Sequence, residues 1–516
     1  MQAFRVGWQA FWLTLLLCGT TGCASVDYHQ TKSESFALTN TSETPLGKEA
    51  THLLERQPPD QSGFIPLLDG VQALAYRLAL IESATRSIDI QYYLIKNDPI
   101  GRIFTAAIYK AAERGVRIRI NLDDIFTQGY DEALLALNAH PNIEIRLFNP
   151  WSARKFRLGN VFSFAQLNRR LHNKSLTADN QFTIIGGRNI AGEYFAARQD
   201  LNFMDADVLA TGPLVHEVST MFDAYWNNPL SVPVNQLAKS KKEPKQVVDA
   251  LLLAAQRDTN NFSGTPYEKA VIDDIELLVN ETDSLFVWAP YQFIYDAPEK
   301  AFAKASPDTK TIVAPILDIL GEAKQELVIV SPYFVPLKSG VKEIGSLIDA
   351  GVQVKIITNS LASNNHTLVH AGYTHYRKDV LKTGAKLYET HYKAPVSGSE
   401  RIYLENAGAT LHTKAFFVDG KLVFVGSFNF DPRSANLNTE MGVVIYSELL
   451  ATKHLENLQQ KLDEYTYEVV LNNEKKVRWI DRSNATVQQF SKEPDTGFWR
   501  RAVCRFLSIL PIRSQL

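Results

Sequence analysis

The chain has 516 residues, which is enough for roughly two to four ordinary domains. Its 54 Lys and Arg residues and 56 Asp and Glu residues give a formal net charge of −2, which argues against nucleic-acid binding by bulk charge alone. A hydrophobic fraction of 45% and a charged fraction of 21% exclude a disordered or fibrous chain, and three cysteines are too few for a disulfide framework.

The N-terminus carries a targeting pattern. Residues 6–17 form an apolar run that is short for a bilayer span and typical of a secretory signal. The next small residues, Thr21-Gly22-Cys23-Ala24, resemble a bacterial lipoprotein box, in which the cysteine thiol is acylated. We therefore expect residues 1–23 to be a signal peptide with lipidation at Cys23; plain secretion and an uncleaved N-terminal anchor remain alternatives.

Two long stretches of the chain repeat one another. Residues 87–120 and 326–357 each have the pattern of a strand, a crossover helix and a second strand, which predicts parallel pairing in an α/β unit. The later landmarks His172 and His412 lie 240 residues apart. The predicted organisation is a linker over 24–60, a first α/β domain over 61–240, a connecting region over 241–309, a second α/β domain over 310–475 and a tail over 476–516.

Each copy carries the same set of polar residues. A histidine lies two residues before a lysine, and an aspartate follows five residues after the lysine, as His172, Lys174 and Asp179 and again as His412, Lys414 and Asp419. Residues two apart in a strand share a face, so each His and Lys would lie on one surface. The segments 186–189 and 426–429 follow at equal distances, and their small residues allow close approach of a ligand to Asn189 and Asn429.

This set suits phosphoryl transfer. Histidine titrates near neutrality, so one imidazole can attack phosphorus while its twin donates a proton, and the lysines supply positive charge for phosphate oxygens. Neither copy alone has both a nucleophile and an acid, which explains why both copies would be needed. No carboxylate cluster or His-Glu metal spacing accompanies the set, so the residues require no metal ion or other cofactor. We predict metal-free transfer through a covalent phosphohistidine.

Over residues 61–475 the chain resembles the phospholipase D superfamily, whose signature is His-x-Lys-x4-Asp followed by Gly-Ser/Gly-x-Asn. The segments 170–195 and 205–213 resemble the cardiolipin synthase C type more narrowly. The resemblance implies duplicated α/β domains, each a central mixed sheet flanked by helices, related by a pseudo-two-fold axis with one active site at their interface. It also implies transfer of a phosphatidyl group, with phosphatidylethanolamine as donor, to the headgroup hydroxyl of phosphatidylglycerol.

The resemblance also implies roles for single residues. His172 would be the nucleophile and His412 the general acid and later the base. Lys174, Lys414, Asn189, Asn429 and Ser427 would bind phosphate, although the first copy has Gly187 in place of Ser427. Asp205 and Glu440 would orient the histidines; counted along the chain, Asp205 follows His172 by 33 residues and Glu440 follows His412 by 28. Within the catalytic motifs, we expect Asp179 and Asp419 to hold a turn more than to touch substrate.

The C-terminal tail has a distinct composition. Residues 497–516 contain four arginines and no acidic residue, interleaved with apolar side chains. Such a basic amphipathic segment can lie in an anionic membrane interface, or it can pack on the domain as a closing helix. Both alternatives remain open from the sequence.

The leading hypothesis is a phosphatidyltransferase in the bacterial cell envelope, membrane-associated and lipid-anchored facing the periplasm. Its partners would be phospholipids and the membrane surface, with no nucleic acid, and a single chain would suffice as a monomer. A phospholipid hydrolase is a close alternative, because a phosphohistidine does not specify its acceptor. The balanced charge disfavours a secreted nuclease, and the two intact motifs disfavour a non-enzymatic lipoprotein.

Overall fold

The computed structural model describes residues 26–28, 30–154, 164–393 and 408–510. The predicted signal peptide and the lipidation site Cys23 lie outside these residues. Within them, no helix combines the length and the apolar character that a membrane span needs.

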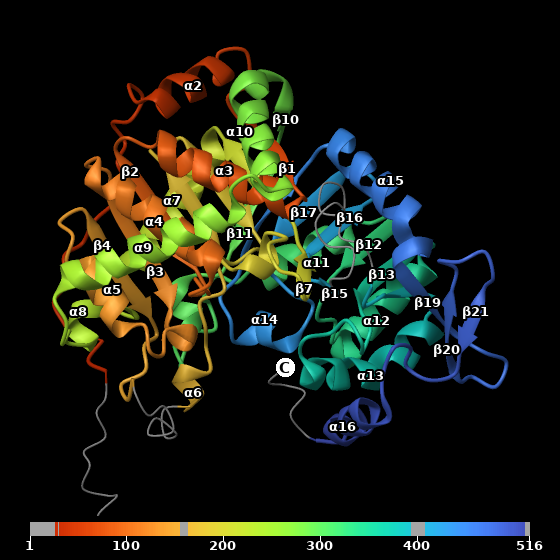
Figure 1. Cartoon of the computed structure of the whole chain (residues 1–516). Helices are drawn as coiled ribbons and strands as arrows, with labels where there is room; N and C mark the ends of the chain where they lie inside the picture. Colours follow the sequence, from red (N-terminus) through yellow and green to blue (C-terminus); the bar gives the residue numbers. More distant parts are fainter. Residues whose placement is uncertain (1–25, 29, 155–163, 394–407, 511–516) are drawn as a thin grey trace, which may run out of the picture.

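Most strands belong to two mixed sheets, one in each copy, with helices covering them (Figure 1). In spatial order the first sheet contains β10 (Val287–Ala289), β1 (Ser62–Leu67), β8 (Asp207–Thr211), β6 (Phe182–Gly186), β5 (Ser175–Ala178), β2 (Ser87–Tyr92), β3 (Arg117–Asp123), β4 (Ile143–Phe148) and β9 (Ser231–Pro233). The second contains β11 (Tyr291–Tyr295), β18 (Met441–Ile445), β17 (Leu422–Gly426), β16 (Ala415–Val418), β12 (Glu326–Val330), β13 (Gln353–Asn359), β14 (Lys386–Thr390), β19 (Thr466–Leu471), β20 (Val477–Asp481) and β21 (Gln488–Phe490). A separate parallel pair, β7 (Leu201–Met204) and β15 (Gly408–Leu411), joins the copies.

The helices follow the duplication in part. The first copy and the connecting region contain α2 (Pro45–Leu54), α3 (Gly70–Ser83), α4 (Pro99–Glu113), α5 (Asp131–Asn138), α6 (Phe164–Leu167), α7 (Pro213–Asn227), α8 (Val234–Leu237), α9 (Pro244–Phe262) and α10 (Pro266–Leu285). The second copy and the tail contain α11 (Val313–Gly321), α12 (Leu337–Asp349), α13 (Thr367–Lys382), α14 (Pro432–Asn436), α15 (Glu448–Tyr465) and α16 (Phe498–Ser508). Short 3-10 turns are η1 (Asp124–Phe126), η3 (Gly192–Tyr194) and η4 (Pro298–Ala301).

The crossover units form as their repeated sequences predict. In the first copy, β2 pairs in parallel with β3 after passing through α4, whose first turn is capped by the Asp98 side chain and started by Pro99. In the second copy, β12, α12 and β13 make the same unit. The spatial run from β8 to β4 in one sheet matches the run from β18 to β14 in the other. The predicted duplicated α/β fold is thereby confirmed.

The segment predicted as a linker is instead attached to the first domain. Its second half contains α2, and its extended first half lies against buried arginines of β3 and β4. Arg119 donates to the carbonyl of Ser35 at 2.8 Å, and Arg146 donates to the carbonyl of Ser33 at 2.6 Å. Buried guanidinium groups need acceptors, and the backbone of this segment supplies them. The polar composition of residues 24–60 therefore did not mean that this segment is a linker without contacts to the domain.

The connecting region and the tail each contribute strands to a sheet. After α9 and α10, β10 extends the first sheet and β11 pairs with β18 in the second, with only Pro290 between them. In the tail, β20 and β21 continue the second sheet beyond the predicted boundary at residue 475. The basic tail proper is α16, which packs on α13 through the buried Cys504.

Candidate active site

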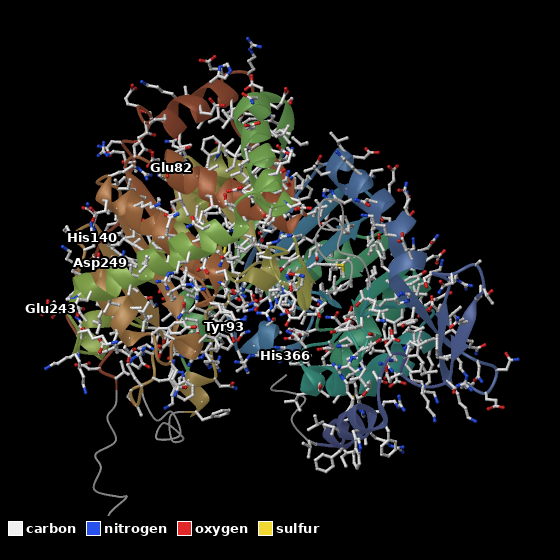
Figure 2. All side chains as sticks on the ribbon, viewed as in Figure 1. Glu82, Tyr93, His140, Glu243, Asp249 and His366 are labelled. Atoms are coloured by element: carbon white, nitrogen blue, oxygen red, sulfur yellow. The ribbon has the colours of Figure 1, made fainter. Side chains whose placement is uncertain are left out.

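The two motif histidines line one cavity between the copies. The cavity has a volume of about 410 Å³, and His172 and His412 both reach it from opposite halves. Tyr93 of the first copy and His366 of the second also line it, and Figure 2 shows these two side chains at the junction of the halves. The repeated motifs therefore form one shared site.

Short parallel pairings across the copies position both histidines. Strand β15 ends at Leu411 opposite Met204, the last residue of β7, and the next amide, that of His412, donates to the Met204 carbonyl at 2.7 Å. On the other side, the His172 amide donates to the carbonyl of Thr439 at 2.9 Å. Each pairing therefore places a histidine beside a carboxylate residue: Asp205 follows Met204, and Glu440 follows Thr439, which forms an isolated bridge with Leu171.

The carboxylates are consequently exchanged between the copies. Nδ1 of His172 lies 2.8 Å from Oε2 of Glu440, and Nδ1 of His412 lies 2.5 Å from Oδ2 of Asp205. Counting along the chain pairs each carboxylate with the histidine of its own copy, and the structure corrects that pairing. A carboxylate on Nδ1 holds a proton there and leaves Nε2 as the reactive nitrogen.

Glu440 is itself held by several donors. The hydroxyl of Ser427 donates to Oε2 at 2.5 Å, and the hydroxyl of Ser434 donates to Oε1 at 2.9 Å. The backbone amide of Glu440 donates to Asp296 at 2.8 Å. Ser427 is fully buried and directed at this carboxylate, so the expectation that its hydroxyl contacts phosphate is corrected. Burial raises the pKa of Glu440 to about 7.

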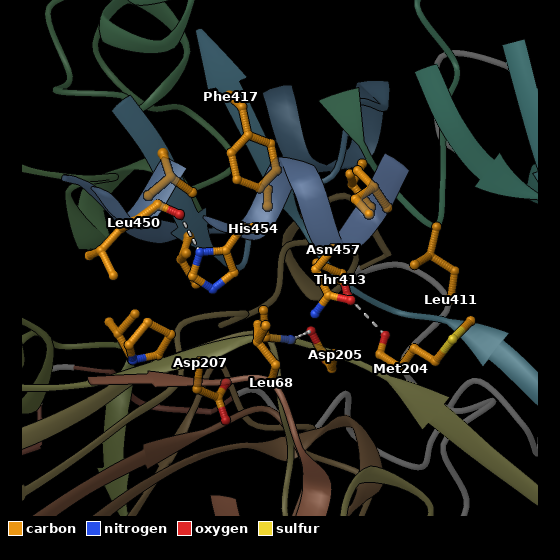
Figure 3. A pocket seen from close by; sticks show the side chains of 18 of the residues that line it. Leu68, Met204, Asp205, Asp207, Leu411, Thr413, Phe417, Leu450, His454 and Asn457 are labelled. Carbon is orange, nitrogen blue, oxygen red and sulfur yellow. Dashed lines mark hydrogen bonds between the residues drawn. The ribbon is translucent and has the colours of Figure 1, made fainter. Parts of the chain in front are cut away.

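Asp205 has a different environment because the first copy has a glycine at the serine position. A Cβ atom on Gly187 would lie 2.2 Å from Oδ1 of Asp205, so no larger residue fits there with the carboxylate in place. Asp205 also borders an apolar cavity of about 210 Å³, between Met204, Leu411 and α15 (Figure 3). Burial among these groups raises the pKa of Asp205.

The two lysines lie close to the histidines. Nζ of Lys414 is 2.9 Å from Nδ1 of His412 and donates to its backbone oxygen at 2.5 Å, while Nζ of Lys174 donates to the backbone oxygen of His172 at 2.6 Å. Burial lowers the pKa of Lys174 to about 7 and that of Lys414 to about 8. Burial and then the two lysines hold the pKa of both histidines well below the usual range. A bound anion would favour the protonated lysines.

The two asparagines line the same cavity. Nδ2 of Asn189 donates to the Tyr194 hydroxyl at 2.9 Å, and the backbone amide of Asn429 donates to Ser434 at 3.3 Å. The Oδ1 atoms of both asparagines are buried and have no hydrogen-bond partner among the described residues. A buried carbonyl oxygen without a partner is costly, so each Oδ1 suits a ligand group that donates a hydrogen bond, such as a hydroxyl or an ammonium.

The motif aspartates lie away from the cavity. Asp179 accepts hydrogen bonds from the backbone amides of Thr85, Arg86 and Ser87, at 2.8 to 3.1 Å. Asp419 does the same for residues 324–326 of the second copy. Both adopt left-handed backbone conformations, with φ of 49° and 53°. These bonds fit the structural role expected of both aspartates from the sequence: they fix the start of β2 and β12.

Several cavity residues have no counterpart in the sequence-based assignment. The ring of Tyr93 meets His172 edge-on at 5.0 Å, and Phe203 stacks on His412 at 5.4 Å between ring centroids. Asp431 and Arg433 of the second copy also line the cavity. Burial raises the pKa of Asp431 to about 7. Only the closeness of Asp431 and Arg433 to Asn429 in the sequence could have pointed to them.

Comparisons with known proteins agree with this geometry. A family model described as "Cardiolipin synthase, PLD-like domain" matches residues 78–226 and 316–463. The chain belongs to this family. It is 39% identical over 467 residues to cardiolipin synthase C of Escherichia coli (strain K12), covering 88% of this chain and 96% of that protein. It is 24% identical over 414 residues to cardiolipin synthase 1 of Bacillus anthracis, covering 78% and 68%.

A solved structure supports the fold. The crystal structure of phosphatidylserine synthase from Haemophilus influenzae Rd KW20 matches with a TM-score of 0.55 and 13% identity, covering 91% of this chain and 99% of that one. This likeness supports the duplicated fold. The two segments matched by the family model confirm the predicted membership in the phospholipase D superfamily.

Proposed function

We propose that this protein is a phosphatidyltransferase that forms cardiolipin through a phosphohistidine intermediate. The observation that carries the proposal is the single cavity lined by two histidines, each with a buried carboxylate on Nδ1 and a lysine beside it. The 39% identity to a cardiolipin synthase over most of both chains supports the choice of a phospholipid substrate.

The proposed reaction has two balanced steps. Nε2 of His172 attacks the phosphorus of the donor, and the bond from phosphorus to the headgroup oxygen breaks as His412 gives that oxygen a proton. The second step begins when the hydroxyl of an acceptor lipid loses its proton to His412 and attacks the phosphorus. The bond to Nε2 then breaks and the phosphodiester product leaves. Lys174, Lys414 and the two asparagines would stabilise the charge on the phosphate oxygens.

The proposed donor is phosphatidylethanolamine and the proposed acceptor is phosphatidylglycerol. With water as acceptor, the same intermediate would yield phosphatidic acid, so the acceptor decides between transferase and hydrolase. Both histidines come from one chain, so the proposed chemistry needs no second protein chain.

We further propose that the protein acts at a membrane surface in the bacterial envelope, with Cys23 as a lipid anchor facing the periplasm. Helix α16 supports surface binding, since Cys504 faces α13 while Phe498, Trp499 and Phe506 are exposed. The helix also carries Arg500, Arg501 and Arg505. Apolar side chains beside arginines suit an anionic interface, so α16 can pack on the domain and still contact lipid.

The test uses the purified chain with vesicles of phosphatidylglycerol and phosphatidylethanolamine, analysed by lipid mass spectrometry. We expect cardiolipin to appear together with free ethanolamine, and a trapped phosphatidyl group on the peptide that contains His172. His172→Ala and His412→Ala should each abolish product. Phosphatidic acid without cardiolipin would assign hydrolysis, and a trapped group on His412 would reverse the roles of the two histidines.

A further inference from the structure

A second cavity lies directly beside the catalytic one in the first copy. It has a volume of about 340 Å³ and lies between β3, α4, α5 and α9. Tyr93, Leu94 and Phe126 line both cavities, so the two spaces share a wall. Tyr93 contacts His172 on one side and the ring of Phe126, at 5.2 Å between centroids, on the other. We call this space the α9 cavity.

Helix α9 forms one wall of the α9 cavity with a stripe of small and apolar side chains. Val247, Ala250, Leu251 and Ala254 all line the cavity, at the three- and four-residue spacing of one helix face. Two of these residues are alanines, which leave space that larger side chains would fill. The helix is fastened to α4 by Asp258, whose two oxygens accept from Nε and Nη2 of Arg102 at 2.6 and 3.1 Å.

The opposite wall is formed by core side chains. Ile120 and Leu122 of β3 and Ile145 of β4 line it, together with Leu134 of α5. Each charged residue of the lining has an ion-pair partner: Arg102 pairs with Asp258, Lys96 with Glu193 and Asp123 with Arg170. Such a lining offers little to a charged ligand and suits hydrocarbon. Its volume is within the usual range of about 300–1,000 Å³ for ligand cavities.

We propose that the α9 cavity binds a fatty acyl chain of the phosphatidyl group whose phosphate lies between His172 and His412. The inference rests on the proposed function, because a phosphatidyl group joins its phosphate to acyl chains through one glycerol. A chain leaving the catalytic cavity next to His172 meets Tyr93 and Phe126 first. The α9 cavity lies directly beyond those two rings, and most of its lining is apolar.

The experiment narrows the α9 cavity and varies the donor. Ala254→Phe places a ring in the cavity, and Leu253→Phe is its matched control, because Leu253 is the neighbouring residue on α9 and is 54% exposed. Each protein is assayed with a dihexanoyl and a dioleoyl phosphatidyl donor in mixed micelles. Each methylene group withdrawn from water is worth about a fourfold change in KM, so long chains report on the cavity far more than short ones.

We expect Ala254→Phe to lower kcat/KM by about tenfold or more for the dioleoyl donor and to leave the dihexanoyl donor within about twofold. Leu253→Phe should match the unmodified chain with both donors. An equal loss with both donors, or no loss with either, would overturn the proposal. If the unmodified chain turned over neither donor, the proposed function would be contradicted. The photolabelling experiment below would then decide whether the α9 cavity binds an acyl chain.

Labelling needs no turnover and no cavity-filling variant. The His172→Ala protein is irradiated with a phospholipid that carries a diazirine at the end of one acyl chain, and the modified peptides are sequenced. We expect label on residues 247–254 of α9 and on β3, and competition by dioleoyl but not dihexanoyl lipid. Label confined to other parts of the chain would overturn the assignment.

Discussion

Nδ1 of His172 lies 2.8 Å from the carboxylate of Glu440, which comes 268 residues later in the chain. Asp205 stands in the same relation to His412, in the reverse direction. Each copy therefore supplies the carboxylate that holds the other copy's reactive ring. A single copy would have an imidazole without its positioning group, so the duplicated chain forms one catalytic unit.

Removing either carboxylate's charge should impair the chemical step. For Glu440→Gln and Asp205→Asn we expect kcat to fall about 10²-fold or more, because the imidazolium that forms during proton transfer loses its counter-charge. Loss of a negative neighbour lowers the pKa of the histidine further, so the acidic limb of the pH–rate profile should move to lower pH. Steady-state kinetics from pH 5 to 9 measure both effects. An unchanged kcat with an unchanged profile would show that the contact has no catalytic consequence.

Giving the first glycine-rich segment the serine of the second should damage the enzyme. In Gly187→Ser the new Cβ would lie 2.2 Å from Oδ1 of Asp205, so the carboxylate must move away from His412. We expect a loss of kcat of about 10²-fold. The reverse change, Ser427→Gly, removes one hydrogen bond to Glu440 and should be milder. Comparable rates for Gly187→Ser and the unmodified chain would contradict the geometry.

The motif aspartates should affect stability more than catalysis. Asp179→Ala leaves three backbone amides at the start of β2 without their acceptor, and we expect it to cost roughly 3 kcal/mol of unfolding free energy. Asp179→Asn should retain most of the stability, since asparagine tolerates the left-handed conformation and keeps an acceptor oxygen. Denaturant unfolding measures the difference. A folded Asp179→Ala protein with abolished kcat would instead give this residue a catalytic role.

Anion binding should depend on pH through the two lysines. Their pKa values of about 7 and 8 mean that both are charged at pH 6 and both are largely neutral at pH 9. A phosphodiester anion of constant charge, such as dimethyl phosphate, should therefore bind at least roughly tenfold tighter at pH 6 and take up protons near pH 8. Calorimetry in buffers of different ionisation enthalpy measures the uptake. Lys174→Met should reduce it, and an affinity independent of pH would contradict the proposed phosphate contacts.

Helix α16 should contribute to vesicle binding. The double change Trp499→Ser with Phe506→Ser removes side chains that are 79% and 61% exposed, so the fold should be unaffected. We expect weaker sedimentation with vesicles rich in phosphatidylglycerol, and a remaining affinity that falls with salt because the arginines are screened. Val487→Ser, at an exposed apolar position outside α16, is the control. Equal binding by the double variant would leave α16 with a packing role only.

The sequence was sufficient for the parts of the molecule that repeat. The strand–helix–strand units, the His-Lys pairs and the glycine-rich segments recur at nearly constant offsets. They define the fold, and they supply the cavity residues His172, His412, Asn189 and Asn429. Pairing between copies could not be read this way, because spacing along the chain says nothing about β7 meeting β15. The spacing also could not predict that the Ser427 hydroxyl donates to Glu440. Nor could it predict that buried arginines hold the polar segment before α2 against the domain.

The passage from one sheet to the other has a consequence for the gap between the two imidazoles. Pro290 alone separates β10, at the edge of the first sheet, from β11, at the edge of the second. A residue inserted here would turn the side chains of β11 to the opposite face or force β11 to slip along β18. The length of this one-residue connection thus helps to hold the two halves in register, and a change in it alone would misalign the two imidazoles.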